Sequence, residues 1–263
     1  MKKRILSIVL CLVMVFSLLP FTASAASAIP INEETFPDPV FREYVLKIVG
    51  SSVLTEEKAQ QIEVLDVSKD NIKKVLGDRA PITSLLGIRY LRYVKDLNCS
   101  GQELKKTLNL EQNSRVEKLD CSGNQLTGLW FHKGSSLKYL TCSANKFTAL
   151  NLSKNPELTE LNCSWNQLTA LDLSANTKLQ KIVAQANALT NLNLWGNDDL
   201  KSIDVSKNPK LEILSASHGK LTSLNVSNNR KLVELYVYNN QLTALDVSSN
   251  YLLKKLKIGR ASC

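Results

Sequence analysis

The sequence has 263 residues and a formal net charge of +9, and 44% of its residues are hydrophobic. Its one long apolar stretch lies in the first 25 residues, and Pro20 interrupts it, which argues against a membrane span. The chain has two histidines, His132 and His218, and we find no Ser-His-Asp set, glycine-rich phosphate loop or paired-carboxylate motif. The sequence therefore argues against an enzyme, and we expect no cofactor and no metal.

Residues 1–25 have the pattern of a secretory signal peptide. Residues 2–4 (Lys-Lys-Arg) form a basic start, an apolar stretch follows, and residues 23–25 (Ala-Ser-Ala) have the small side chains of a cleavage site. We therefore expect a protein that is secreted or held at the cell surface, begins near Ala26 and has a net charge of +6 after the three basic residues are removed.

Residues 26–61 are predicted to form a small helical cap that covers the open end of a repeat array. Asp38-Pro39 is a typical helix start, because the carboxylate can cap the first turn and proline fits the first helical position. Apolar residues at helical spacing follow over 40–48, and Gly50 is a typical stop. A second short helix is expected from Thr55.

Residues 62–93 are assigned to an irregular first repeat, with a strand over 62–67, and residues 87–91 lead into the regular array. From 94 to 263 the chain consists of 21-residue units, each made of two halves that read Leu-x-x-Leu-x-(Cys/Leu)-Ser-x-Asn. Alternating apolar residues in each half predict a strand with one inward face. Stacked units would then form parallel sheets in a mainly β repeat solenoid.

Two columns show the period. The asparagines recur at Asn124, Asn145, Asn166, Asn187, Asn208, Asn229 and Asn250. The inward position of the second half recurs at Leu129, Leu150, Leu171, Leu192, Leu214, Leu235 and Leu256, with a single step of 22 residues. Near residues 197–211 the two half-types exchange order, and the motif alone suggests an extra half-repeat over 200–210. Because the columns continue with one added residue, we predict an unbroken stack from Val116 to Leu256.

Four cysteines fall on one inward column, which Ala184 and Val205 continue: Cys99, Cys121, Cys142 and Cys163. Exported proteins often contain disulfides. However, equivalent residues on neighbouring strands lie about 4.8 Å apart with parallel side chains, whereas a disulfide needs Cβ atoms about 3.8 Å apart. We therefore predict buried, reduced thiols that fill the core, with a bridged ladder as the alternative.

The C-terminal end is predicted to be poorly covered. Leu253, Leu256 and Ile258 occupy inward positions, and no helix or polar cap follows them in the sequence. An uncovered apolar end favours fraying or self-association. Cys263 could then link two chains.

The repeat units over about 62–258 resemble the internalin J-type, cysteine-containing leucine-rich repeats of exported Gram-positive proteins. The matching pattern is Leu-x-x-Leu-x-Cys-Ser-x-Asn-x-Leu-Thr-x-Leu-Asp-Leu-Ser-x-Asn, and residues 31–44 are similar to the cap of these proteins. The resemblance implies a slightly curved two-sheet solenoid, a surface or secreted location and a role in adhesion or recognition. Many such caps have a calcium loop, but residues 50–53 (Gly-Ser-Ser-Val) have no acidic ligand, so calcium is not transferred.

Two functions fit these features. The first is a secreted or cell-surface module that binds a protein or a glycan outside the cell. The second is a scaffold, or a truncated fragment of a larger surface protein whose activity lies in a missing domain, because wall-anchored relatives end with a sorting signal that is not found here. Residues 94–263 have 21 basic and 14 acidic residues, a net charge of +7 that suits anionic partners, although scattered lysines also serve solubility. No nucleic acid partner and no membrane insertion are expected.

The candidate binding residues lie in the later coils of the second sheet, where they are predicted to point outward: Trp195, Ile213, Tyr236, Tyr238, Lys255 and Lys257. Tyrosine and tryptophan on adjacent strands form a flat recognition platform, and lysines beside them suit a glycan or an acidic polypeptide. Repeat drift, or coverage by a second chain, would also explain exposed aromatic residues. Tyr139 and Trp165 on the first sheet are the second choice.

Overall fold

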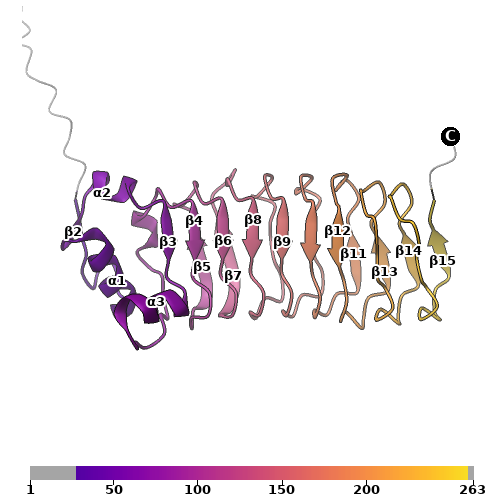
Figure 1. Cartoon of the computed structure of the whole chain (residues 1–263), viewed down its shortest axis with the longest axis horizontal. Helices are drawn as coiled ribbons and strands as arrows, with labels where there is room; N and C mark the ends of the chain where they lie inside the picture. The colour runs from indigo at the N-terminus through magenta and orange to yellow at the C-terminus, as the bar shows by residue number, and fades with distance from the viewer. Residues whose placement is uncertain (1–27, 260–263) are drawn as a thin grey trace, which may run out of the picture.

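Helices gather at one end of an elongated stack of coils in the computed structural model, which describes residues 28–259 (Figure 1). The predicted signal peptide and Cys263 lie outside the described residues. None of the described helices is long and apolar enough to cross a membrane.

The cap begins as the sequence predicts. Helix α1 (Pro39–Val49) starts after Asp38, whose carboxylate accepts hydrogen bonds from the backbone amides of Val40 and Phe41. The helix ends at Gly50, which has a left-handed φ of 66°. Helix α2 (Glu56–Gln60) follows, and β1 (Ile29–Pro30) pairs with β2 (Val53–Leu54) beside them. Helix α3 (Lys69–Leu76) was not predicted, although Ser68 caps its first turn in the usual way.

Asp38 also fixes the loop that leads into the repeats. Its second carboxylate oxygen accepts hydrogen bonds from the amides of Thr83 and Ser84, at 2.8 and 3.2 Å. Asp38 itself is buried, so the loop over 81–92, including the 3-10 turn η1 (Ile88–Tyr90), is held against the start of α1.

Each coil of the stack contributes strands to one or both sides of the solenoid. The first side has a parallel seven-stranded sheet made of β3 (Val64–Asp66), β4 (Asp96–Asn98), β6 (Lys118–Asp120), β8 (Tyr139–Thr141), β9 (Glu160–Asn162), β10 (Lys181–Val183) and β12 (Ser202–Asp204). The second side has two separate parallel sheets: β5 (Lys105–Leu110) with β7 (Gln125–Phe131), and β11 (Asn191–Asn193) with β13 (Ile213–Ser215), β14 (Glu234–Tyr236) and β15 (Lys255–Lys257).

The stack is unbroken through residues 200–210, as predicted. Strand β12 pairs in register with β10 on the first side, and Leu192 is opposite Leu214 on the second. The turns explain the one added residue that makes the step from Leu192 to Leu214 22 residues long. The coil between Leu192 and Leu214 contains two long Asn-x-x-Leu turns, at 197–200 and 208–211, whereas the regular coils combine one long turn with one short Asn-x-Leu turn.

The extent of the two sheets differs from the prediction. The sequence suggests that the first sheet continues to the last coil, but residues 223–227 form no strand, although Leu224 still faces the core. The hydrogen-bonded ladder ends on the first side at β12 and continues on the second side from β11 to β15. The exchange occurs where the long and short turns exchange places.

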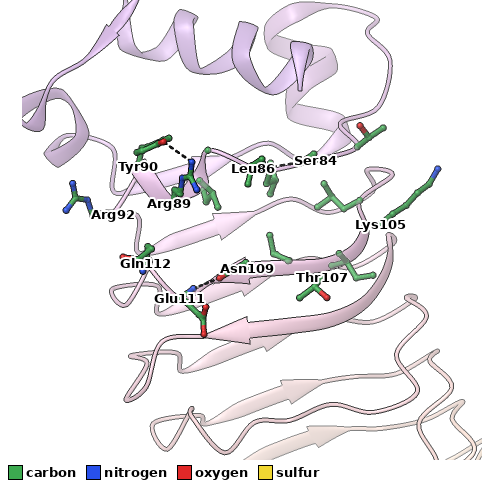
Figure 2. A pocket seen from close by; sticks show the side chains of 17 residues that line it. Ser84, Leu86, Arg89, Tyr90, Arg92, Lys105, Thr107, Asn109, Glu111 and Gln112 are labelled. Carbon is green, nitrogen blue, oxygen red and sulfur yellow. Dashed lines mark hydrogen bonds between the residues drawn. The ribbon is translucent and has the colours of Figure 1, made fainter. Parts of the chain in front are cut away.

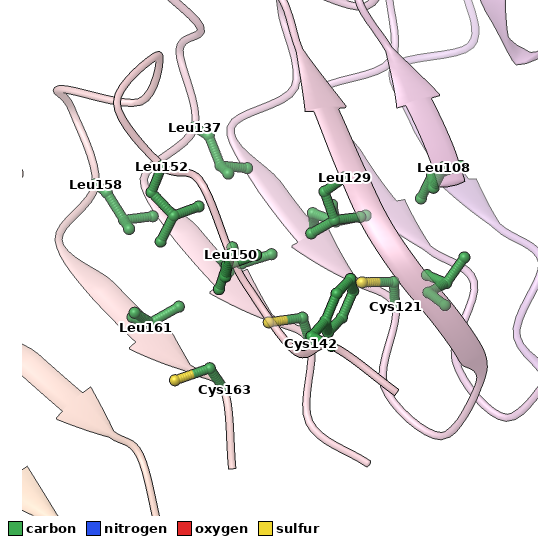
Figure 3. Close-up of a cluster of buried hydrophobic side chains, with 14 of the residues drawn as sticks. Leu108, Cys121, Leu129, Leu137, Cys142, Leu150, Leu152, Leu158, Leu161 and Cys163 are labelled. Atoms are coloured by element: carbon green, nitrogen blue, oxygen red, sulfur yellow. The ribbon is translucent and has the colours of Figure 1, made fainter. Parts of the chain in front are cut away.

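The core consists of inward leucines and the cysteine column, and successive coils place Cys121, Cys142 and Cys163 side by side (Figure 3). Their predicted burial is confirmed, and all are free thiols, as is Cys99. Loss of solvent raises the pKa of each thiol, that of Cys163 to about 12. The thiols therefore act as small apolar core residues.

The last coil is poorly covered within the described residues. Leu256 is 39% exposed and Ile258 is 55% exposed, although Leu253 remains half-buried. Apolar residues at this end thus lose the shielding that each earlier coil receives from the next one.

Candidate functional site

The predicted binding residues come together on the outer surface of the four-stranded sheet. Strand register places Ile213, Glu234 and Lys255 opposite one another in one row. The neighbouring row consists of Ser215, Tyr236 and Lys257. We call this surface the late-coil face and define it by Trp195, Ile213, Glu234, Tyr236, Tyr238, Lys255 and Lys257.

Trp195 is the most exposed aromatic residue of the late-coil face, with 68% of its surface accessible. Trp195, Ser217 and Tyr238 each follow the inward leucine of their strand by three residues, so they share one line across the sheet. Strand spacing places Trp195 and Tyr238 two coils, or roughly 10 Å, apart. Small side chains lie between them: Ser215 ends β13, and Ser217, two residues later, is buried.

A charged network lies at the centre of the late-coil face. The Glu234 carboxylate accepts two hydrogen bonds, one of 2.6 Å from the Lys255 ammonium and one of 2.7 Å from the Tyr236 hydroxyl. The bond from Lys255 lowers the pKa of Glu234, and the bond to Glu234 raises the pKa of Tyr236. Lys255 is therefore paired within the protein and is not the free cation that the sequence suggested.

The remaining polar groups of this surface contact the aromatic rings. The Lys257 ammonium lies 5.9 Å from the centre of the Tyr236 ring, and it is in no salt bridge among the described residues. The His218 ring meets that of Tyr238 edge to face, with ring centres 5.0 Å apart. Because these contacts already restrict both tyrosine side chains, the side chains would lose little conformational entropy when a ligand binds.

The structure places the predicted residues together but exposes them unequally. Ile213, Tyr236 and Tyr238 are half-buried, whereas Trp195 and both lysines are exposed. On the other side, Tyr139 at the start of β8 is 45% exposed, and Trp165 is 55% exposed although the Lys207 ammonium lies 4.7 Å from the centre of its ring. The second-choice aromatic pair is thus more exposed than Tyr236 and Tyr238 and less exposed than Trp195.

The sequence did not predict a groove at the opposite end of the molecule, between the loop over 83–92 and strand β5 (Figure 2). Its volume is about 550 Å³. A second hollow of about 430 Å³ lies along β7, beside Trp130 and Phe131. A signal was available, because residues 130–134 (Trp-Phe-His-Lys-Gly) replace the usual Asp-Leu-Ser-x-Asn of the repeat.

Solved structures support the resemblance seen in the repeat units. The functional domain of InlJ from Listeria monocytogenes, which includes a cysteine ladder, is 28% identical, with a TM-score of 0.54; the match covers 88% of this chain and 57% of that one. The chain is an internalin-like leucine-rich-repeat protein. No family model matches it, and no curated protein matches its sequence.

Two further solved structures are similar to this chain. Internalin C2 from Listeria monocytogenes is 19% identical over 89% of this chain and 97% of its own, with a TM-score of 0.44. YopM, a leucine-rich effector protein from Yersinia pestis, is 20% identical over 77% of this chain and 55% of its own, with a TM-score of 0.47.

Proposed function

We propose that this internalin-like protein is an exported binding module that recognises an extracellular protein or glycan through the late-coil face. The observation that carries the proposal is the line formed by Trp195 and Tyr238 beside Tyr236 on one sheet. Aromatic anchors held on rigid strands are typical of recognition surfaces, since they contribute large contact areas with few rotatable bonds. The signal pattern of residues 1–25 supports export.

The chemistry of the surface favours a neutral or mildly acidic ligand. Glu234 compensates Lys255, so Lys257 is the one lysine of the late-coil face without a carboxylate partner among the described residues. Sugar rings and aromatic side chains stack on exposed indole and phenol rings, whereas a polyanion would need more unpaired cations. A glycan or a weakly charged protein segment therefore fits best.

The test compares the chain from residue 26 onwards with two variants, Trp195→Ala and the double variant Tyr236→Ala/Tyr238→Ala, on a glycan array and on purified cell-wall polymers. Each variant should weaken retention about tenfold or more, as expected for central aromatic anchors. Tyr139→Ala on the opposite side is the matched control and should bind as the parent does. Equal retention by all variants would remove the late-coil face from consideration. A parent chain that retains nothing would favour the scaffold or fragment alternative.

A further inference from the structure

The groove near the cap is a preformed slot with two fixed walls. One wall is the loop that includes Arg89, Tyr90 and Arg92, and the other is β5, which presents Lys105 and Asn109 (Figure 2). The walls are joined at both ends. The Glu103 amide donates to Ile82 O at 3.1 Å, and Asn113 Nδ2 donates to Ile88 O and Leu91 O at 3.0 Å.

Between these ends the edge of β5 is open. Strand β5 pairs with β7 on one side and with no strand on the other among the described residues. No backbone hydrogen bond joins residues 83–92 to 105–110. A strand paired on one side leaves a row of amides and carbonyls facing away, here toward the slot. Because the pairing of β5 shifts register between Lys106 and Thr107, and Lys106 has a left-handed φ of 61°, the regular part of this edge is residues 107–110, roughly 13 Å long.

The cations of the slot have no carboxylate partner. Some lysines elsewhere pair with carboxylates of the preceding coil, whereas others, such as Lys106 and Lys257, are in no salt bridge among the described residues. The pairs are Lys95–Glu63, Lys118–Asp96, Lys138–Glu117, Lys178–Glu157, Lys181–Glu160, Lys220–Asp199 and Lys255–Glu234. Arg89, Arg92 and Lys105 are in no salt bridge within residues 28–259. The one carboxylate of the lining, Glu111, already contacts Lys154 at 3.6 Å. The slot is therefore net positive.

The floor of the slot is apolar. Leu85, Leu104 and Leu108 line it and are buried, and Leu86 is exposed at its lip. A ligand that fills the slot therefore meets main-chain hydrogen-bonding groups on one wall, apolar side chains below and positive charges at both ends. These are the features of an extended peptide site, in which the backbone gives affinity and alternate side chains give specificity.

We propose that this slot binds an extended acidic peptide segment, which adds as a strand to the free edge of β5. Carboxylates at alternate positions would meet Arg89 and Arg92 at one end and Lys105 at the other, and the intervening apolar side chains would face the leucine floor. The same cations repel a second copy of β5, so they disfavour edge-to-edge pairing of this protein with itself. The site lies at the cap end and does not depend on the late-coil face.

Binding is tested with a fluorescent hexapeptide of alternating glutamate and valine on the chain from residue 26 onwards, with the lysine–valine peptide as the charge control. Two further peptides are N-methylated at alternate amides, one at the glutamates and the other at the valines. Because successive amides of a strand point to opposite edges, one methylated peptide should lose binding and the other should keep it.

Charge variants locate the site. Arg92→Glu and Lys105→Glu should each weaken binding of the acidic peptide about tenfold or more. Lys106→Glu is the matched control, since Lys106 lies on the same strand but does not line the slot, and it should change binding less than about threefold. Hydrogen exchange should slow over residues 105–110 when the peptide is bound, and circular dichroism checks that each variant is folded.

Several results would overturn the proposal. Absence of acidic-peptide binding at millimolar concentration is one, and equal binding of both methylated peptides is another, because it would exclude strand addition. Equal weakening by Lys106→Glu and Lys105→Glu would indicate attraction by overall charge alone. Displacement of the peptide by a uronic acid oligosaccharide, without protection of residues 105–110, would make the slot a sugar site.

Discussion

Lys207 and His218 lie on opposite sides of one coil, and both adopt a left-handed backbone conformation, with φ values of 55° and 62°. In earlier coils, apart from Lys106 within β5, the left-handed non-glycine residues follow the strands of the first side, as at Ala186 after β10. In the next coil, the left-handed residue is Asn239, after β14 on the second side. One coil therefore has both turns, and the ladder of strands changes side there without a break in the stack.

Left-handed backbone at non-glycine positions implies a stability difference that can be measured. Ala186 has a φ of 54°, whereas Ala188 has no positive φ. Since an L-residue in this region costs roughly 1–2 kcal/mol and glycine is free of that cost, Ala186→Gly should raise the free energy of unfolding by about 1 kcal/mol. Ala188→Gly should lower it by about the same amount. Urea denaturation measures both, and a loss of stability in both variants would contradict the assigned turn.

The asparagine columns lead to a second prediction. Asn145 Nδ2 donates to Cys121 O and Cys142 O, at 2.9 and 3.2 Å, and its Oδ1 accepts from the Leu126 amide at 2.9 Å. Asn145→Ala leaves these buried groups unpaired and should cost roughly 2–4 kcal/mol of unfolding free energy.

Asn155 provides the control for the asparagine prediction. It is equally buried, but neither atom of its side-chain amide has a hydrogen-bond partner among the described residues. Asn155→Ala should therefore change the free energy of unfolding by less than about 1 kcal/mol. Thermal and chemical denaturation measure the free energy of unfolding of both variants. Equal losses in Asn145→Ala and Asn155→Ala would show that packing, and not the hydrogen-bond ladder, accounts for the column.

Much of the fold could be predicted because it depends on periodic or local signals. Asp38, Pro39 and Gly50 mark α1 by chemistry within the helix itself, and the inward columns repeat often enough to define every coil. The change of side could not be predicted in the same way. Both sides have the same inward pattern, and nothing in the identity of Lys207 requires a left-handed φ.

The functional surfaces show the same division. Alternation along a strand predicts that Tyr236 and Lys255 share an outer surface, and strand register confirms it. Alternation does not predict that Glu234 pairs with Lys255, because this depends on rotamers across two strands. The slot beside β5 depends on contacts that are distant in sequence, since Asp38 holds the loop at Thr83. Such contacts leave no periodic signal.

Position within the stack should determine the cost of removing an inward leucine. Leu161 is 1% exposed between two coils, whereas Leu256 in the last described coil is 39% exposed. Leu161→Ala should cost about 2–5 kcal/mol, because it removes buried methyl groups and leaves a cavity. Leu256→Ala should cost about 1 kcal/mol or less, since the site is already open to solvent.

Hydrogen exchange and sedimentation test whether the last described coil frays or self-associates. Hydrogen exchange over 253–258 should be faster than over 160–162 if the last coil opens locally. Sedimentation with and without reductant separates self-association from a link through Cys263. A monomer under both conditions, with slow exchange at 253–258 and a large loss of stability in Leu256→Ala, would mean that this end is covered in solution.

The buried thiols should make stability depend on pH in the alkaline range. Burial raises the pKa of Cys163 from its ordinary 9.0 to about 12, so above about pH 9 the unfolded chain loses a proton that the folded chain keeps. The stabilisation is fully present below pH 9 and is lost as the pH rises toward 12, at about 1.4 kcal/mol per pH unit for each such thiol. The advantage of the parent over Cys163→Ala should therefore shrink by about 2–3 kcal/mol between about pH 9 and 11. Leu161→Ala, at a neighbouring buried site without a titrating group, should differ from the parent by a constant amount over this range. Urea denaturation at several pH values provides both differences, and a constant difference for Cys163→Ala would mean that its thiol ionises as readily in the folded chain as in the unfolded one.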